Sequence, residues 1–221
     1  MKKLYGFIIL LGLVLLLAAC GSDQASKKEQ SNGDTESSST SQLTTEQKME
    51  KYEYTSEEFG DYFLLGIYTN KAEGLSYEPI SVTFDNFTLE GGLSLVEIDL
   101  NEEAKKLEQF SGKDTVRAVM LEMETDNEND YEFTYHGRAT AKTETGDELT
   151  GFISPDSELV KDYTTDDYIE HGIMYFLLDD LNSEPKQLEI TFEPPERDGK
   201  PVGDAQTVKS GDLVPESDLD K

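Results

Sequence analysis

The chain has 221 residues and a formal net charge of −28, since 47 acidic side chains stand against 19 basic ones. A field of that sign repels nucleic acid and anionic lipid headgroups, which excludes both as expected partners and favours cations and basic protein surfaces. Acidic residues also keep a secreted domain soluble, so the charge alone does not separate partner binding from solubility.

The first 19 residues have the layout of a secretory signal peptide. Lys2 and Lys3 precede an apolar run over 7–17 that only Gly12 interrupts. The run is much shorter than the roughly 20 apolar residues of a membrane-spanning helix. We therefore expect residues 1–19 to be removed from the mature protein.

The end of this signal, Leu17-Ala18-Ala19-Cys20, resembles the lipobox of bacterial lipoproteins. Cys20 is the only cysteine in the chain, so it has no partner for an intramolecular disulfide. The resemblance implies a diacylglyceryl group on the Cys20 thiol, and two acyl chains are enough for stable membrane anchoring. We expect a lipoprotein held at the extracellular face of the cell membrane. An ordinary secretory signal with an incidental cysteine is the alternative.

Residues 20–47 form a predicted linker between this lipid anchor and the rest of the chain. They are rich in Ser, Thr, Gln and charged residues and almost free of apolar ones, a composition that cannot bury enough surface to fold. A flexible coil of this length would hold the following domain at an r.m.s. distance of roughly 30 Å from its lipid.

Residues 48–195 are long enough for one domain with its own core. Apolar and polar residues alternate with a period of two in several segments, which predicts half-buried β-strands. Two more continuously apolar segments, 116–123 and 173–178, predict central strands. Turn signals such as Gly91-Gly92 and Gly146-Asp147 separate these runs, and the pattern predicts an all-β sandwich of about seven strands. The alternating segments are 80–84, 131–135 and 188–192.

Two short helices and a tail complete the predicted elements. One helix is expected over 45–52, and another begins after Asn101, whose side chain is a good helix N-cap. After Pro194 and Pro195 the chain is rich in Gly, Asp, Lys, Pro and Ser. We expect 196–221 to be a disordered acidic tail.

A series of motifs runs through the second half of the predicted domain: Val116-x-x-Val119-x-Leu121-x-Met123, Asn127, Phe133, Gly146-Asp147, Gly172-x-x-x-Phe176 and Leu188-x-Ile190-x-Phe192. Their order and spacing resemble the telokin-like, immunoglobulin-like domain of many Gram-positive surface lipoproteins, which is similar in turn to the mycobacterial immunoprotective extracellular antigen. The resemblance implies an extracellular β-sandwich without assigned catalytic residues, of a kind suspected of binding partners at the cell surface. With the Ser/Thr-rich linker, it indicates a Gram-positive source.

Asp126, Glu128 and Asp130 are the best candidates for metal ligands, because loops present carboxylates to calcium at this alternating spacing. The segment is not an EF-hand, since Tyr131 stands where the loop needs Gly and Gly137 where it needs Glu. It is equally a polar β-turn that needs no metal. The cluster Asp166-Asp167-x-x-Glu170 is a second candidate for the same ion. The metal site and the polar turn both stay open as interpretations, so calcium is the one cofactor considered.

The sequence has no recognisable catalytic constellation. His136 and His171 are its only histidines, they stand far apart, and no Gly-x-Ser-x-Gly nucleophile elbow exists. We predict a protein that is not an enzyme but a non-catalytic binding domain at the cell surface, with a cationic or protein partner in the envelope. A calcium-binding acidic β-sandwich is the alternative.

Overall fold

The computed structural model describes residues 42–69 and 79–219 of the chain. The predicted signal peptide, Cys20 and most of the predicted linker lie outside these residues. The elements of the described part are α1 (Thr45–Lys51), β1 (Tyr54–Glu57), β2 (Gly60–Thr69), β3 (Ile80–Phe84), β4 (Phe87–Leu100), η2 (Ala104–Lys106), η3 (Glu108–Phe110), β5 (Thr115–Asn127), β6 (Phe133–Tyr135), β7 (Ala139–Thr143), β8 (Glu148–Ile153), β9 (Lys161–Tyr163), β10 (Tyr168–Leu178), β11 (Leu188–Phe192), β12 (Glu196–Arg197), β13 (Lys200–Pro201), β14 (Gln206–Lys209), β15 (Asp212–Pro215) and η4 (Glu216–Asp218).

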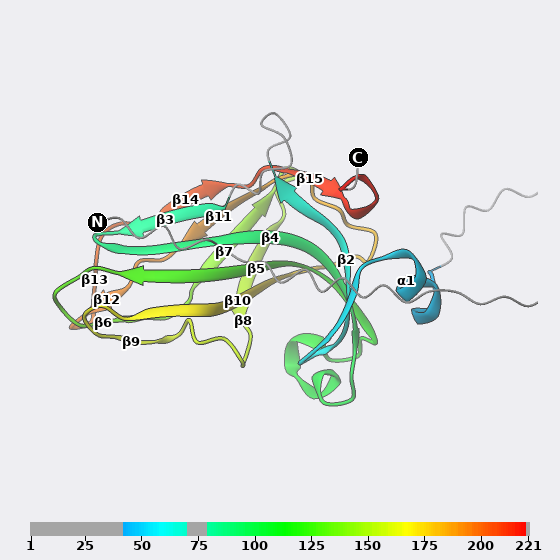
Figure 1. The fold of residues 1–221 in the computed structure, drawn as a ribbon, viewed down its shortest axis with the longest axis horizontal. Helices are drawn as coiled ribbons and strands as arrows, with labels where there is room; N and C mark the ends of the chain where they lie inside the picture. The colour runs from blue at the N-terminus through cyan, green and yellow to red at the C-terminus, as the bar shows by residue number, and fades with distance from the viewer. Residues whose placement is uncertain (1–41, 70–78, 220–221) are drawn as a thin grey trace, which may run out of the picture. The chain divides into compact units, whose positions relative to one another are not determined.

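The strands of the described part form two antiparallel sheets (Figure 1). The larger has eleven strands: nine follow the path β1-β2-β4-β5-β10-β8-β7-β11-β14, and the other two are β15, which pairs with β2, and β3, which pairs with β4. The smaller sheet has the order β13-β12-β6-β9. The prediction of an all-β fold is therefore confirmed.

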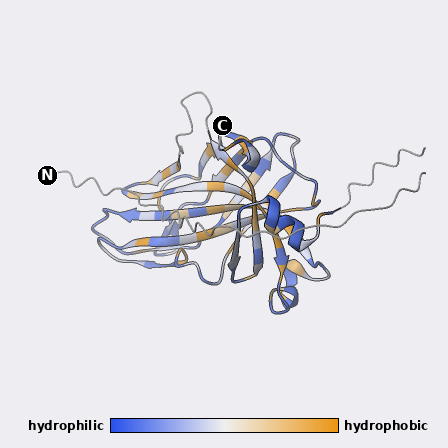
Figure 2. Cartoon of the chain, turned by 45° about the vertical axis from the view of Figure 1, so that its right-hand side comes forward, coloured by the Kyte–Doolittle hydropathy of each residue, from blue (hydrophilic) through white to orange (hydrophobic). Residues whose placement is uncertain are grey.

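Strands β4 and β5 are the longest of the described chain, and they pair from Phe87 opposite Asn127 to Asp99 opposite Thr115. Successive side chains of a strand point to opposite faces. Leu95 of β4 accordingly belongs to the main hydrophobic core, whereas the next residue, Val96, belongs to a second cluster. Figure 2 shows hydrophobic and hydrophilic residues alternating along the strands.

An aromatic group joins the two sheets within the main core. Phe133 of β6 stacks on Tyr163 of β9, with ring centroids 5.3 Å apart and an interplanar angle of 8°. Phe87 of β4 meets both rings edge-on, at 4.9 Å from each. Rings of this size bury large apolar areas, so this group stabilises the packing of the small sheet against the long strands.

The second cluster lies on the opposite face of the long strands, beneath the two 3-10 turns η2 and η3. Phe110 of η3 packs edge-on against Phe59, with ring centroids 5.2 Å apart. Asn101 begins this segment as predicted, because its side-chain oxygen accepts from the backbone N–H groups of Glu103 at 3.1 Å and Ala104 at 2.8 Å. The segment forms two 3-10 turns rather than one helix, since Leu107 between them is extended.

Two predicted boundaries are wrong. The linker does not continue to residue 47, because Thr44 caps helix α1 and accepts from Gln47 N–H in a capping box. The predicted helix itself is confirmed as α1. The tail over 196–221 is not disordered in the part that the structure describes, since β14 pairs with β11 and β15 pairs with β2. Its scattered apolar residues explain the difference: Val214 is fully buried, and Val208 packs against the main core.

The described residues contain fifteen strands rather than about seven. Several are short pairs or triplets, such as β9, β12 and β13, which carry no readable alternation of their own. In the part of the chain that the structure describes, no helix is long and apolar enough to cross a membrane.

Candidate functional site

The three predicted metal ligands lie where strand β5 ends. Asp126, Glu128 and Asp130 are exposed, whereas the intervening Asn127 and Asn129 are buried. Among the described residues, no three His, Cys, Asp or Glu side chains are placed to hold a metal ion. The structure thus does not assemble the predicted calcium ligands.

Hydrogen bonds of two buried asparagines order this turn. The Asn127 amide donates to the Thr164 carbonyl at 2.7 Å. The Asn127 side-chain oxygen accepts from the backbone N–H and the side-chain amide of Asn129, both at 3.1 Å. These bonds satisfy the side chain of Asn127, whereas the buried Asn129 Oδ1 has no hydrogen-bond partner among the described residues.

Carboxylates gather instead on the outer face of β4, β5 and β10. Strand β5 presents Glu122, Glu124 and Asp126 at alternate positions, and the cross-strand register places Glu90 of β4 directly opposite Glu124. Like charges directly opposite each other on neighbouring strands destabilise a sheet. We call Glu90, Glu122, Glu124, Asp126 and Glu170 the acidic face.

A bulge in β10 completes the acidic face. The pairing of β10 with β5 shifts register between Ile169 and Gly172, so that Glu170 and His171 together stand opposite the single residue Glu124. The Tyr168 hydroxyl, on a side chain that is 52% exposed, donates to Glu170 Oε1 at 3.1 Å. The bulge thus adds a carboxylate and an imidazole beside the row on β5.

The pKa values of two carboxyls show that this face is crowded with negative charge. The pKa of Glu124 is raised by partial desolvation and by the nearby charges of Glu170 and Glu90. The pKa of Glu122 is also raised, first by partial desolvation and then by Glu57, although His171 acts in the opposite direction. A cation bound nearby would lower the pKa of both carboxyls and stabilise their ionised forms.

The sequence signal for the acidic face was the alternation of Glu122, Glu124 and Asp126 with Leu121, Met123 and Thr125. Asp126 belongs to the predicted ligand set, and Glu170 belongs to the second carboxylate cluster that the sequence offers. Their proximity to Glu90 and Glu124 could not be predicted, because it depends on the register of three strands.

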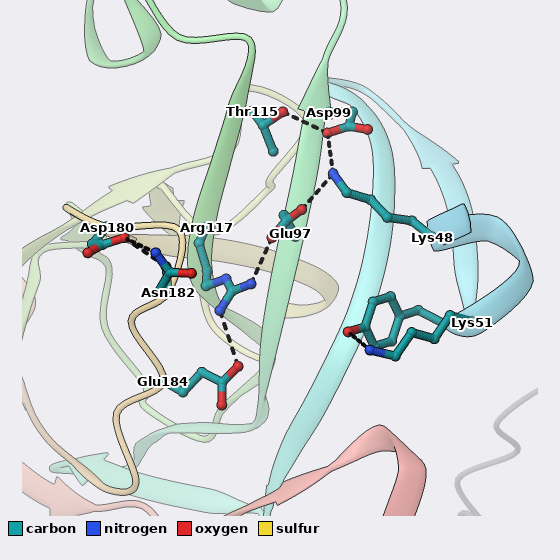
Figure 3. Close-up of polar contacts among 10 residues, drawn as sticks. Lys48, Lys51, Glu97, Asp99, Thr115, Arg117, Asp180, Asn182 and Glu184 are labelled. Atoms are coloured by element: carbon teal, nitrogen blue, oxygen red, sulfur yellow. Dashed lines mark hydrogen bonds and ion pairs between the residues drawn. The ribbon is translucent and has the colours of Figure 1, made fainter. Parts of the chain in front are cut away.

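A second group of charges is buried beneath helix α1 (Figure 3). Lys48 Nζ lies 2.6 Å from Glu97 Oε1 and 2.9 Å from Asp99 Oδ1. Arg117 Nη2 lies 2.8 Å from Glu97 Oε2, and Nη1 lies 3.2 Å from Glu184. Each buried carboxylate is therefore already paired, and this network has a structural role.

The pKa values in this network follow from the pairing. Burial alone would raise the pKa of Asp99, but hydrogen bonds from Lys48, Thr115 and Thr45 hold it below its ordinary value. Burial alone would likewise lower the pKa of Lys48, yet Glu97 and Asp99 raise it. Both groups stay charged through the neutral range.

Another acidic region borders a hollow beside the small sheet. Asp130, Glu132, Asp162 and Glu196 are among the residues that line it. Arg197 covers the ring of Tyr131 there, with its guanidinium carbon 4.4 Å from the ring centroid. The hollow thus has its own cation, which makes it a weaker candidate than the acidic face.

The chain matches no protein-family model and no curated protein. Among solved structures it is similar to a functionally unknown protein from Listeria monocytogenes EGD-e, at 12% identity and a TM-score of 0.47, over 71% of this chain and 88% of that chain.

Proposed function

We propose that this protein is a membrane-anchored, extracellular lipoprotein whose domain binds a cationic partner of the cell envelope through the acidic face. The observation that carries the proposal is the pairing of Glu90 with Glu124 on neighbouring strands. That arrangement lowers the stability of the sheet. Acidic residues that serve only solubility do not need to stand directly opposite each other on neighbouring strands. A cationic partner would remove the repulsion between Glu90 and Glu124 and so gain binding free energy from this arrangement.

The proposed binding is non-catalytic. The acidic face has exposed carboxylates, a tyrosine hydroxyl and one histidine on an outer sheet surface. Carboxylates on such a surface attract basic groups over a distance of about 10 Å at moderate salt and raise the rate of encounter. The partner class is therefore a basic protein or peptide rather than nucleic acid.

The finer fold type is part of the proposal. We propose that the described sheets form an immunoglobulin-like, telokin-like sandwich. Antiparallel pairing and alternating burial along β3, β7 and β11 support it. In that fold, the outer face of a sheet is open to partners wherever no other element covers it.

The proposed anchor is the diacylglyceryl group on Cys20. The segment Leu17–Cys20 supports it, as does the apolar run before it. Cell fractionation of a Gram-positive host tests it: the unchanged chain should sediment with membranes, and Cys20→Ser should move to the medium. Membrane retention of the Cys20→Ser chain would contradict the anchor and leave the binding proposal standing.

Binding is tested with a fluorescent oligolysine peptide and the lipid-free Cys20→Ser chain. Replacing Glu122, Glu124 and Glu170 by Gln should weaken binding by about tenfold, because three partly exposed charge contacts are lost at roughly 0.5 kcal/mol each. The matched control replaces Glu148 by Gln and Asp198 and Asp204 by Asn, three exposed residues away from the acidic face. It removes the same charge and should change affinity by less than about threefold.

If both triple variants weakened peptide binding equally, the acidic face would not be the binding site, since the peptide would then respond only to net charge. The same pair of variants in a pull-down from envelope extract identifies the natural partner. A protein retained by the unchanged chain and by the control, but lost with the acidic-face variant, is the expected result.

A further inference from the structure

Helix α1 is held to the sheet by charge rather than by an apolar stripe. Lys48 is the only buried residue within α1, and its side chain is 8% exposed. Its ammonium lies over the Phe63 ring, 5.3 Å from the centroid, and contacts Glu97 and Asp99. Met49, the large apolar residue of the helix, is 42% exposed. Surface helices are ordinarily held by apolar residues on one face, so this attachment is unusual.

The carboxylates that hold Lys48 also have partners on β5. Glu97 Oε2 accepts from Arg117 Nη2 at 2.8 Å, and Asp99 Oδ1 accepts from Thr115 Oγ1 at 2.8 Å (Figure 3). If α1 leaves, each carboxylate keeps one of these bonds. The pairing of β4 with β5 can therefore survive without the helix.

We propose that α1 is a strap that leaves and rejoins the sheet as a unit while both sheets stay folded. The helix has seven residues, and helices this short are not stable alone in water, so α1 unwinds when it leaves. The exposed socket then holds two carboxylates and one guanidinium, from Glu97, Asp99 and Arg117. Its excess negative charge favours the return of an ammonium group.

The strap changes where the folded part of the chain begins. With α1 docked, ordered structure starts before Thr45; with α1 released, it starts at β1. The freed segment 42–53 spans up to about 40 Å when fully extended. If the chain is anchored at Cys20 as proposed above, docking of α1 sets how far the acidic face reaches from the membrane. The strap itself does not depend on the anchor.

Hydrogen exchange on the full chain tests the strap. The reporters are the amides of Lys48 and Tyr52, which donate to the carbonyls of Thr44 at 2.9 Å and Lys48 at 2.8 Å. In the unchanged chain these amides should exchange at a rate that low denaturant does not alter, as expected for local opening. Lys48→Met should accelerate them by about 10- to 100-fold and leave the amides shared by β4 and β5 unchanged.

Two further variants separate the strap from a general loss of stability. Lys51→Met is the matched control, because the polar contacts of Lys51 within the described part of the chain are with the neighbouring Tyr52, and it should leave exchange in α1 unchanged. Lys48→Met combined with Asp99→Asn removes one buried cation and one buried anion together, so no excess buried charge remains. Acceleration of α1 alone in both Lys48 variants supports the strap. Acceleration of β4 and β5 together with α1 in the double variant, or no acceleration of α1 in Lys48→Met, overturns it.

Discussion

Tyr135 places a hydroxyl in the main core where the described residues offer it no hydrogen-bond partner. The side chain is 1% exposed, and burial raises the pKa of this hydroxyl well above its ordinary value. Tyr163 is equally buried, but its hydroxyl has partners: it donates to the Leu159 carbonyl at 3.2 Å and is hydrogen-bonded to the Thr125 side chain. The two residues therefore form a matched pair for measuring a satisfied and an unsatisfied hydroxyl.

Tyr135→Phe should leave the free energy of unfolding unchanged or raise it by up to about 1 kcal/mol, because a buried polar group without a partner is removed. Tyr163→Phe should lower it by about 1 kcal/mol, because a hydrogen bond is lost and a carbonyl is left unpaired. Urea unfolding of the three chains measures both changes. A loss above about 1 kcal/mol for Tyr135→Phe would mean that its hydroxyl is hydrogen-bonded in solution.

Glu124 provides a prediction that depends on pH. Its folded-state pKa is raised by desolvation, Glu170 and Glu90, so the ionised carboxylate lowers stability at neutral pH. Glu124→Gln should raise the free energy of unfolding by about 0.5 kcal/mol at pH 7. The gain should disappear as the pH falls through the raised folded-state pKa, because the carboxyl of the unchanged chain is then protonated as well.

Urea unfolding at pH 7 and at pH 3 measures the effect of Glu124→Gln, with Asp204→Asn as the control for loss of one exposed charge. A gain that persists at pH 3, or an equal gain from the control, would show that the pairing of Glu90 with Glu124 is not its source. A gain at pH 7 that is absent at pH 3 would mean that the acidic face lowers the stability of the protein when no partner is bound.

At the scale of elements, Asn101 holds the segment that covers the second cluster. Its side-chain oxygen accepts from two backbone N–H groups, and its amide donates to the Glu58 carbonyl at 2.7 Å. Asn101→Ala should lower the free energy of unfolding by about 1 kcal/mol, as for loss of an N-cap. Glu102→Gln removes only an exposed ion pair with Lys105 and should change the free energy of unfolding by less than about 0.5 kcal/mol. Equal effects of the two changes would argue against capping as the cause.

Strands with one buried face were predictable, because their apolar and polar residues alternate. Strands that supply residues to both hydrophobic clusters were not. The strands predicted over 80–84 and 188–192 are β3 and β11. Strand β4 escaped prediction because its inward face changes between Leu95 and Val96 and because Gly91-Gly92 resembles a turn. Gly91 lies inside strand β4. A Cβ at this position would stand 2.1 Å from the Glu122 carbonyl oxygen, so the close approach of β5 requires glycine there.

The candidate site was less predictable than the fold. Strand β5 was interpreted as continuously apolar over 116–123, so the alternation that begins at Glu122 was not recognised. Lys48 was assigned to the start of the domain without a role, because a lysine in a polar helix gives no sign that it will be buried. Its partners Glu97 and Asp99 come from a strand about fifty residues away.

At the scale of the whole molecule, the C-terminal segment is the main difference between prediction and structure. Polar composition and two prolines suggested disorder, yet residues 196–219 supply strands to both sheets. Pro194 and Pro195 lie between β11 and β12, where no ladder hydrogen bond is needed from them. A few well-placed apolar residues were enough to order a polar segment, because each one meets an existing core.

Removing the segment after Pro195 should therefore unfold or severely destabilise the chain. The truncation exposes the edges of β2 and β11 that pair with β15 and β14, and it removes Val214, which is fully buried. The truncation removes four strands, β12 to β15, and one buried aliphatic side chain, and this loss exceeds about 3 kcal/mol, a large part of the stability of an ordinary domain. Thermal unfolding measures it, with truncation after Leu219 as the control that keeps β14 and β15. A chain ending at Pro195 that unfolds at the same temperature as this control would restore the interpretation of the segment as a dispensable tail.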